Sequence, residues 1–382
     1  MQPPFEHRIA ACQRRLEDAE ADLAVCFPSP NLTYLTGFEE TPSERHLLLF
    51  VPEHGDPALV APAMYENQLS DLPIPTLQLR PWTDADDPLE EIAAVLEGYA
   101  LDGSDPATVL VDDRLWATFT QDLRELCPDA EFGLASTALE PLRIRKDDVE
   151  LDALRRAGAI ADQVALEIRD RGDDLVGTTE AELAAEIARQ LAAHGGEEPA
   201  FETIVAAGPN GARPPHHSGS RPIEAGDPIV LDFGAFVPAD LEGGTGRYPG
   251  DQTRTIVVGD PPATYEHVHE TVREAQEAAI DAVEPGVEAG AVDRAARSVI
   301  EAAGYGDAFV HRTGHGVGLE VHEPPYIVAG NDRELEPGMV FSVEPGIYLD
   351  GQFGVRIEDL VVVTDDGAER LNDTPRGWES GR

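Results

Sequence analysis

Three histidines lie close together in the second half of the chain, in the stretch H-R-T-G-H-G-V-G-L-E-V-H-E. They are His311, His315 and His322, and glycines flank the middle one. Histidine is the commonest neutral metal ligand, and it also exchanges protons near neutral pH. Glycine lets a backbone approach closely to whatever such rings bind. The stretch therefore predicts a metal or acid–base site, provided that carboxylates elsewhere in the chain complete it.

Four carboxylates qualify. Asp232, Glu344 and Glu358 sit inside the apolar runs I-V-L-D-F-G, F-S-V-E-P-G and V-R-I-E-D-L, and Asp251 comes just before T-R-T. A charged carboxylate is costly to bury unless it is paired or bound to a metal. A single one would be explained by an ion pair with arginine. Four of them would repel one another and raise each other's pKa values, so cations explain the group better.

These carboxylates and His315 form an oxygen-rich ligand set with one nitrogen. Such a set suits hard or borderline divalent ions, with Mn²⁺ or Co²⁺ expected first and Zn²⁺ or Fe²⁺ as alternatives. Five ligands are too many for one open catalytic ion, but they fit two ions that share bridging carboxylates. A metal pair of this kind activates a water molecule and polarises a carbonyl group.

The second half of the chain must position these ligands, and its pattern predicts an α+β domain whose central strands carry them. Asp147 with Glu150, and Thr179 with Glu182, have the spacing of helix capping boxes. The predicted helices cover 147–171, 179–194, 264–283 and 290–303, and the predicted strands cover 229–236, 254–258, 339–348 and 354–364.

The first half has no cluster of potential ligands, and it alternates short apolar runs with helical patterns. It predicts a separate α/β domain whose role is packing or oligomerisation. The predicted helices are 7–20 and 114–126, and the predicted strands are 22–27, 46–51, 58–61, 76–79 and 108–111. We expect two domains, 1–140 and 141–382.

Acidic residues dominate the composition. The formal net charge is −45, and Lys146 is the only lysine among 28 basic residues. A nucleic acid or an anionic membrane would be repelled by such a chain. An acid excess with almost no lysine is typical of adaptation to concentrated salt, where charges are strongly screened. We therefore expect a salt-adapted source.

Cysteine use and hydropathy indicate the compartment. The three cysteines, Cys12, Cys26 and Cys127, are far apart and form no C-x-x-C motif, which predicts reduced thiols. No apolar run approaches 18 residues, and the first residues lack an apolar core. We expect neither a signal peptide nor a membrane span, and a cytoplasmic location.

Taken in order, the motifs around the five ligands resemble those of the pita-bread metallopeptidases, which include methionine aminopeptidase, aminopeptidase P, prolidase and creatinase. The resemblance covers about residues 145–370. The stretch N-L-T-Y-L-T-G-F at 31–38 resembles the extra N-terminal domain of the prolidase, aminopeptidase P and creatinase branch. The resemblance implies a creatinase/prolidase-type α/β domain followed by a pita-bread α+β catalytic domain.

The resemblance also implies the metal ligands. Asp232 would chelate one metal, Asp251 and Glu358 would bridge both, and His315 and Glu344 would complete the second. Glu344 would in addition take the proton of the attacking water.

Further roles follow from the same resemblance. His322 would hydrogen-bond the substrate carbonyl or the oxyanion, and His311 and His216 would line the substrate pocket. Arg356 would contact a metal ligand or transfer protons. His217 is adjacent to His216, and the P-H-H context favours His216 as the ring that faces the site.

One spacing departs from the family. Asp251 lies 19 positions after Asp232, which is longer than usual, and the extra residues are rich in glycine and proline. They predict an enlarged hairpin loop between two strands that remain paired. Asp240, within this loop, is the fallback ligand should Asp232 not bind metal.

The activity implied is hydrolysis of the bond before proline, by a hydroxide that bridges two metals, in an Xaa-Pro dipeptidase or an Xaa-Pro aminopeptidase. The substrate would be a peptide with proline in second position, and the enzyme a homodimer. Two alternatives stay open: hydrolysis of a non-peptide amide such as ectoine, and an inactive binding module. Binding modules on this fold usually lose metal ligands, and they would hold no stoichiometric metal.

Overall fold

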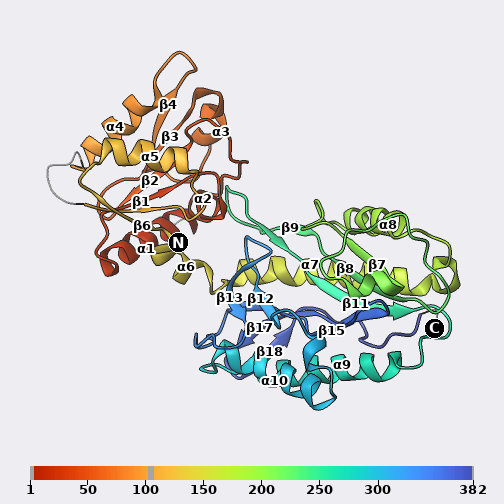
Figure 1. Ribbon diagram of the computed structural model, residues 1–382. Coiled ribbons are helices and arrows are strands. Elements are labelled where there is room, and N and C mark those ends of the chain that lie inside the picture. Colours follow the sequence, from red (N-terminus) through yellow and green to blue (C-terminus); the bar gives the residue numbers. More distant parts are fainter. Residues whose placement is uncertain (1–3, 102–106, 381–382) are drawn as a thin grey trace. The chain divides into compact units, whose positions relative to one another are not determined.

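The computed structural model describes residues 4–101 and 107–380, which belong to two compact units (Figure 1). Unit 1 contains residues 1–143 and 240–246, and unit 2 contains residues 144–239 and 247–382. Contacts within the chain thus place the division after Arg143. A short segment from the middle of the second half also belongs to the first unit, which the sequence did not predict.

Unit 1 is built on a six-stranded mixed sheet with the strand order β4-β3-β2-β1-β5-β6. β1 pairs antiparallel with β2 and parallel with β5. The strands are β1 (Leu23–Cys26), β2 (Leu48–Pro52), β3 (Ala58–Pro62), β4 (Gln78–Trp82), β5 (Thr108–Val111) and β6 (Glu131–Leu134). The α-helices are α1 (Pro4–Asp18), α2 (Pro30–Thr36), α3 (Glu66–Ser70), α4 (Pro88–Gly98), α5 (Ala117–Leu126) and α6 (Ser136–Arg143). The predicted α/β class of this region is confirmed.

The N-L-T-Y-L-T-G-F motif forms α2 and its C-terminal cap. Ser29 caps the helix by accepting hydrogen bonds from two backbone N–H groups, and Gly37 ends it at φ 70°, a conformation that favours glycine. Asn31 donates to the buried Asp112 at 3.0 Å and accepts from Arg143 at 2.8 Å. Within unit 1 these polar side chains tie α2 to the end of β5 and to α6.

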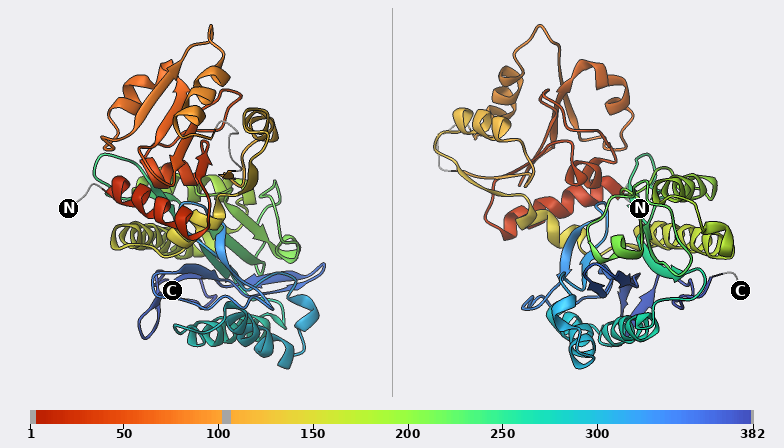
Figure 2. Two further views of the ribbon diagram at one scale, coloured as in Figure 1. Left: turned by 90° about the vertical axis from the view of Figure 1, so that its left-hand side faces the viewer. Right: turned by 45° about the vertical axis from the view of Figure 1, so that its right-hand side comes forward.

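Unit 2 places its strands between two pairs of helices (Figures 1 and 2). The helices α7 (Asp148–Asp170) and α8 (Glu180–Ala193) share one apolar core with the sheet β11-β8-β7. The helices α9 (Tyr265–Asp281) and α10 (Ala289–Ala302) share another with the sheet β13-β12-β14-β17-β18. Each pair covers the apolar face of its strands, as an α+β layer arrangement requires.

The strands of unit 2 are short. They are β7 (Ile204–Ala207), β8 (Pro228–Phe233), β9 (Phe236–Pro238), β10 (Arg247–Pro249), β11 (Gln252–Val257), β12 (Gly314–Gly316), β13 (Glu323–Ile327), β14 (Val340–Val343), β15 (Gly346–Leu349), β16 (Phe353–Arg356), β17 (Asp359–Thr364) and β18 (Gly367–Arg370). Over both units, the described residues also form four 3₁₀ turns, at 63–65, 172–175, 208–212 and 306–308. Both predicted capping boxes are confirmed, since Asp147 with Glu150, and Thr179 with Glu182, exchange side-chain and backbone hydrogen bonds.

Three predicted strands were wrong in their continuity. The strand expected over 229–236 ends at Phe233, and the one over 339–348 breaks into β14 and β15 at Glu344. The one over 354–364 breaks into β16 and β17 before Asp359. Pro345 has no N–H to give a sheet, which explains the second break. Glu344 and Glu358 therefore lie in gaps between strands, and not inside them.

The long connection between Asp232 and Asp251 forms a second hairpin. β8 and β11 remain antiparallel partners, with Asp232 opposite Thr253, so the predicted pairing is confirmed. β9 and β10 extend the connection as a separate antiparallel pair. Its tip, residues 240–246, belongs to unit 1, where Thr245 donates two hydrogen bonds to the carbonyl of Gly37.

Two further properties concern the whole described chain. Cys12, Cys26 and Cys127 are buried free thiols. Within residues 4–101 and 107–380, no helix combines the length and the apolar character needed to span a bilayer.

Candidate metal centre and active site

All five predicted ligands lie in unit 2, on or beside the strands at its centre. Asp232 is in β8, Asp251 comes immediately before β11, and His315 is the middle residue of β12. Glu344 follows β14, and Glu358 precedes β17. Four of them are buried, and Glu344 is partly buried. Strands of two sheets and the residues that flank them thus supply these side chains.

Glycines on both sides of His315 make room for β12. A Cβ atom on Gly314 would lie 1.8 Å from the carbonyl oxygen of Ser342, and one on Gly316 would lie 2.2 Å from that of Pro324. Both oxygens belong to backbone that cannot move away cheaply. Only glycine therefore fits on either side of His315, which is the close backbone approach that G-H-G predicted.

Three of the predicted ligands form a tight cluster. Asp251, His315 and Glu358 each offer one ligand atom, and these atoms all lie within 4.8 Å of one another. The carboxylate of Glu344 joins them, with 3.4 Å between its Oε1 and Nε2 of His315. The structure therefore brings four of the five predicted ligands together around one point.

Asp232 is linked to this cluster through Arg356. The guanidinium of Arg356 donates from Nη2 to one carboxylate oxygen of Asp232. The other oxygen, Oδ1, is buried and has no hydrogen-bond partner among the described residues. A buried anionic oxygen without a donor is what a bound cation would satisfy. The fallback ligand, Asp240, is exposed and belongs to unit 1.

The carboxylates of the cluster repel one another. Burial raises the pKa of Asp251 and of Glu358 well above their usual values, and repulsion from the neighbouring carboxylates adds to this. Burial also raises the pKa of Asp232, and it raises that of Glu344 to about 7. Arg356 is the one arginine that hydrogen-bonds a carboxylate of this group among the described residues. Divalent cations would offset the remaining negative charge, so the residues present fit a metal centre.

Two histidines complete the accessible side of the cluster. Burial lowers the pKa of His315 to about 3, so its ring is neutral and able to coordinate a metal. The ring of His322 stands edge-on to it, with 4.0 Å between centroids. Because His322 is exposed, its ring is available to a ligand bound over the cluster.

A hydrogen-bonded chain runs from Asp232 through Arg356 to Tyr348 and His311. Nδ1 of His311 lies 2.7 Å from the carbonyl oxygen of Arg312 and must carry the proton, so Nε2 accepts from the hydroxyl of Tyr348 at 2.8 Å. That hydroxyl accepts from Nη1 of Arg356 at 2.9 Å. Sequence reasoning placed His311 and Arg356 at the site but missed Tyr348, although it ends the S-V-E-P-G-I-Y motif.

Two hydroxyl groups support the carboxylates, and both were also missed. Thr253 donates to Glu358 at 2.6 Å and accepts from Nε of Arg356 at 3.0 Å. Ser342 donates to Glu344 at 3.2 Å and accepts from the backbone N–H of His315 at 3.1 Å. Each lies two residues from a predicted ligand, so the period of two in a strand is the signal that could have found it.

The two adjacent histidines of the segment 208–219 have different surroundings. His216 is partly buried, and it lines a small cavity together with Arg356 and Asn210. The side chain of His217 is 81% exposed and pairs with Glu202 in solvent. Of the two rings, His216 is therefore the one next to the hydrogen-bonded chain that ends at Asp232.

Comparison with known proteins identifies the family. Residues 152–365, more than half of the chain, match the family model described as Metallopeptidase family M24. The chain belongs to this family. Residues 8–145 match the Creatinase/Prolidase N-terminal domain. The expected fold, a creatinase-type domain followed by an M24 catalytic domain, is confirmed, and so is the expected class of enzyme.

Relatives of this M24 metallopeptidase cover nearly its whole length. A protein of Mycobacterium bovis named "Probable dipeptidase PepE" is 41% identical over 97% of this chain and 95% of its own length. The Xaa-Pro dipeptidase of Lactobacillus helveticus is 37% identical over 95% of this chain and 96% of its own. The crystal structure of a prolidase from Thermococcus sibiricus, 36% identical, covers 98% of both chains with a TM-score of 0.88.

Proposed function

We propose that this M24 metallopeptidase is an Xaa-Pro dipeptidase with two divalent metal ions held by Asp232, Asp251, His315, Glu344 and Glu358. The observation that carries the proposal is the buried carboxylate–histidine cluster, whose negative charge Arg356 alone does not balance. Relatives named Xaa-Pro dipeptidase or prolidase match this chain over nearly their full lengths, which supports the substrate class.

When bound, the two ions would activate a water molecule and polarise the scissile carbonyl group. Glu344 would take a proton at its carboxylate from that water, since the carboxylate lies at the cluster, 3.4 Å from His315. It would then return the proton to the proline nitrogen as the peptide bond breaks. His322 would donate to the substrate carbonyl oxygen and stabilise the charge that develops there.

The remaining polar residues would hold the substrate and the ligands. His216 and His311 would line the pocket on the side of Arg356. Arg356 would hold one carboxylate oxygen of Asp232 in place, and the other oxygen, Oδ1, would be left to bind the metal. Since Tyr348 joins Arg356 to His311, these three side chains hold one another in place beside the metal ligands.

The metal identity and the setting of the enzyme complete the proposal. Oxygen-rich ligands with one imidazole favour Mn²⁺ or Co²⁺, with Zn²⁺ and Fe²⁺ as competitors. We expect a homodimer in the cytoplasm of a salt-adapted cell, because the net charge of −45 needs screening to be tolerated.

Parallel hydrolysis of an Xaa-Pro dipeptide and an Xaa-Pro-Yaa tripeptide tests the function. Both reactions would contain Mn²⁺ or Co²⁺ and concentrated KCl. We expect cleavage of the dipeptide and little or none of the tripeptide. Cleavage of the tripeptide at an equal or higher rate would indicate an aminopeptidase instead. If neither peptide were cleaved while two metals were bound, a non-peptide amide would become the better substrate class.

A further inference from the structure

Glu180 is the first residue of α8, and its side chain is completely buried. An ionised carboxylate without water needs several donors or a cation close by. Among the described residues, no arginine or lysine forms an ion pair with Glu180, and His216 is its one partner that could carry a charge. The cost of burying this carboxylate must be offset by hydrogen bonds, and those bonds fix the positions of the groups that donate them.

The donors to Glu180 come from one segment. The carboxylate accepts the N–H of Ala207 at 2.8 Å and that of Gly219 at 3.1 Å, which lie at the two ends of the irregular segment 208–219. Between them, Asn210 donates at 2.9 Å and Nε2 of His216 at 3.0 Å. One carboxylate therefore holds both ends and the middle of the segment that carries His216.

The contact with His216 also decides how that ring is presented. A carboxylate only accepts hydrogen bonds, so Nε2 must carry a proton in either charge state of the ring. Nδ1 has no partner among the described residues and is the nitrogen left for another molecule. His216 and Asn210 line one small cavity with Arg356, which binds Asp232. The two side chains that donate to Glu180 thus line a cavity together with Arg356, the hydrogen-bond partner of the predicted metal ligand Asp232.

We propose that Glu180 is a positioning residue for catalysis: it fixes the tautomer and orientation of His216 so that Nδ1 faces the substrate. The proposal rests on the proposed function, since it assigns His216 to the substrate pocket. Glu180 does not touch the substrate itself, and its effect on turnover passes through His216. This predicts that its contribution disappears when His216 is absent.

A double-mutant cycle tests this dependence. We expect Glu180→Gln and His216→Ala each to lower kcat/KM for an Xaa-Pro dipeptide about 10–100-fold, as loss of a group that orients an active-site side chain does. The double variant should be no worse than His216→Ala alone. Metal content should stay at the wild-type value in all three. Glu202→Gln is the matched control, because it breaks the equivalent pair with exposed His217 and should leave kcat/KM unchanged.

Two outcomes of the cycle would overturn the proposal. One is full activity of Glu180→Gln. The other is a multiplicative loss in the double variant, which would mean that Glu180 acts on stability or on another group.

The imidazole ¹⁵N shifts of His216 in the wild-type protein provide a second measurement, which does not require Glu180→Gln to fold. His216→Ala identifies the signals, and we expect the proton on Nε2. A neutral ring protonated on Nδ1 would contradict the proposal. This readout uses no substrate, so it separates the two proposals. A wild-type enzyme with Nε2–H that cleaved no Xaa-Pro peptide would disprove the proposed function and leave the assigned ring geometry in place.

Discussion

Glu358 and Asp359 are neighbours in the chain, both are buried, and the protein treats their charges in opposite ways. The carboxylate of Glu358 faces Asp251, His315 and the hydroxyl of Thr253, and its pKa is raised well above the usual value by burial and by the carboxylates around it. The nearby Arg254 contacts Glu358 only at its backbone carbonyl oxygen.

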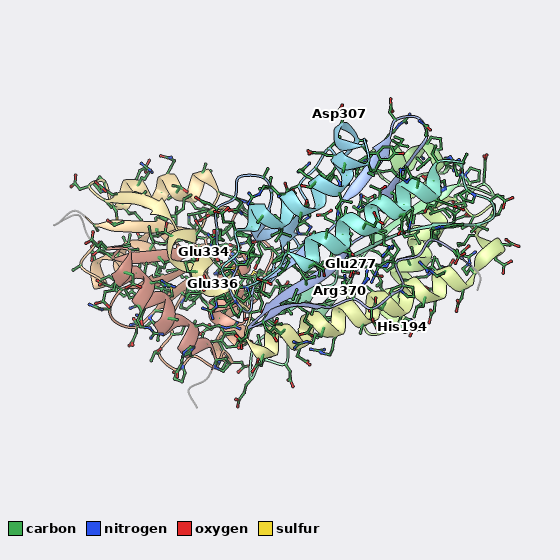
Figure 3. The ribbon with its side chains drawn as sticks, turned by 90° about the horizontal axis from the view of Figure 1, so that it is seen from below. His194, Glu277, Asp307, Glu334, Glu336 and Arg370 are labelled. Atoms are coloured by element: carbon green, nitrogen blue, oxygen red, sulfur yellow. The ribbon has the colours of Figure 1, made fainter. Side chains whose placement is uncertain are left out.

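Asp359 points to the other side of the strand, where positive charge is abundant. It accepts hydrogen bonds from Arg254 at 2.6 Å and from Arg376 at 3.0 Å, and Arg370 lies 3.7 Å away. Arg370 in turn binds Glu277, and Figure 3 shows these two side chains next to each other on β18 and α9. The protein supplies every cation that this carboxylate needs.

The difference teaches how to separate a structural from a catalytic carboxylate. Burial alone does not do so, because both residues are below 3% exposed. The source of the counter-charge separates them. Arginines of the protein neutralise Asp359, whereas the carboxylates around Glu358 need bound metal ions. The predictions below test this contrast, beginning with the largest effect.

Replacing Glu344 should abolish catalysis without unfolding the protein. In Glu344→Gln we expect kcat to fall about 10²–10⁴-fold, since the variant lacks the group that accepts the proton. The thermal midpoint should stay within a few degrees of wild type, because the amide removes a repelled charge. Steady-state kinetics on an Xaa-Pro dipeptide, with Glu334→Gln as a control for loss of one exposed carboxylate, would measure this. Near-normal turnover would remove Glu344 from its assigned role.

Replacing Asp359 should lower the stability of the fold, in contrast to the replacement of Glu344. Asp359→Asn leaves buried arginine charge without its partner, so we expect the free energy of unfolding to fall by about 3–5 kcal/mol. Denaturant unfolding would measure it. The matched control is Glu336→Gln, which breaks an exposed pair with Arg145 and should cost about 1 kcal/mol or less. Equal losses in the two variants would argue against the structural role of the Asp359 network.

Metal removal should make stability depend on pH in one direction. In the metal-free protein, Glu344 has a folded-state pKa of about 7, above its unfolded value, so the folded state holds the proton more tightly. Its stabilising effect is complete below the unfolded pKa and is lost as pH rises through about 7.

The measurement is the thermal midpoint of chelated protein at pH 5 and pH 7.5. We expect Glu344→Gln to lose less stability than wild type over this interval, by about 2 °C or more. Subtracting the variant also cancels the buried histidines, whose lowered pKa values act in the opposite sense. An identical change in both proteins would show that Glu344 does not titrate in this range. Saturating metal should abolish the difference.

The effect of salt on the thermal midpoint should come from many weak contributions, spread over all the exposed acidic residues. Raising KCl from about 0.1 M to about 1 M shortens the screening length from ~10 Å to ~3 Å. This weakens repulsion among the many exposed acids, so we expect the thermal midpoint to rise. The Asp359 network should respond less, because its charges are compensated and buried. A midpoint that did not change with KCl would contradict adaptation to salt.

The sequence predicted the parts of this site that depend on local pattern. Both capping boxes, the paired strands β8 and β11 and the helices α7, α8, α9 and α10 followed from spacing and periodicity. The ligands stood out because carboxylates are rare in apolar runs. Those signals lie within a few residues of each other, so no tertiary information was needed.

The parts that were missed depend on contacts between distant segments. Glu180 and His216 are 36 positions apart, and Arg254 and Asp359 are 105 apart. An arginine or a glutamate in an amphipathic pattern gives no sign of its partner. Continuous apolar runs also concealed the breaks at Glu344 and Glu358, because hydropathy does not report where a strand stops pairing.

The tip of the β9–β10 hairpin has a consequence for anyone who wishes to separate the two units. Residues 240–246 belong to unit 1, where Gly244 packs against Phe5 and Thr245 binds Gly37. A fragment that starts at Ile144 would keep this tip and lose its partners. Cutting the chain once, at the boundary that the family matches suggest, therefore does not yield an independent unit.

Shortening the hairpin would remove this obstacle. Joining Pro238 to Arg247, which face each other across the pair, by a two-residue Asn-Gly turn would let β9 and β10 close without the tip. The hairpin is thus a covalent seam between the units as well as an insertion, because the chain passes between them three times instead of once. Dissection, circular permutation and domain exchange of this protein should be planned around all three passages.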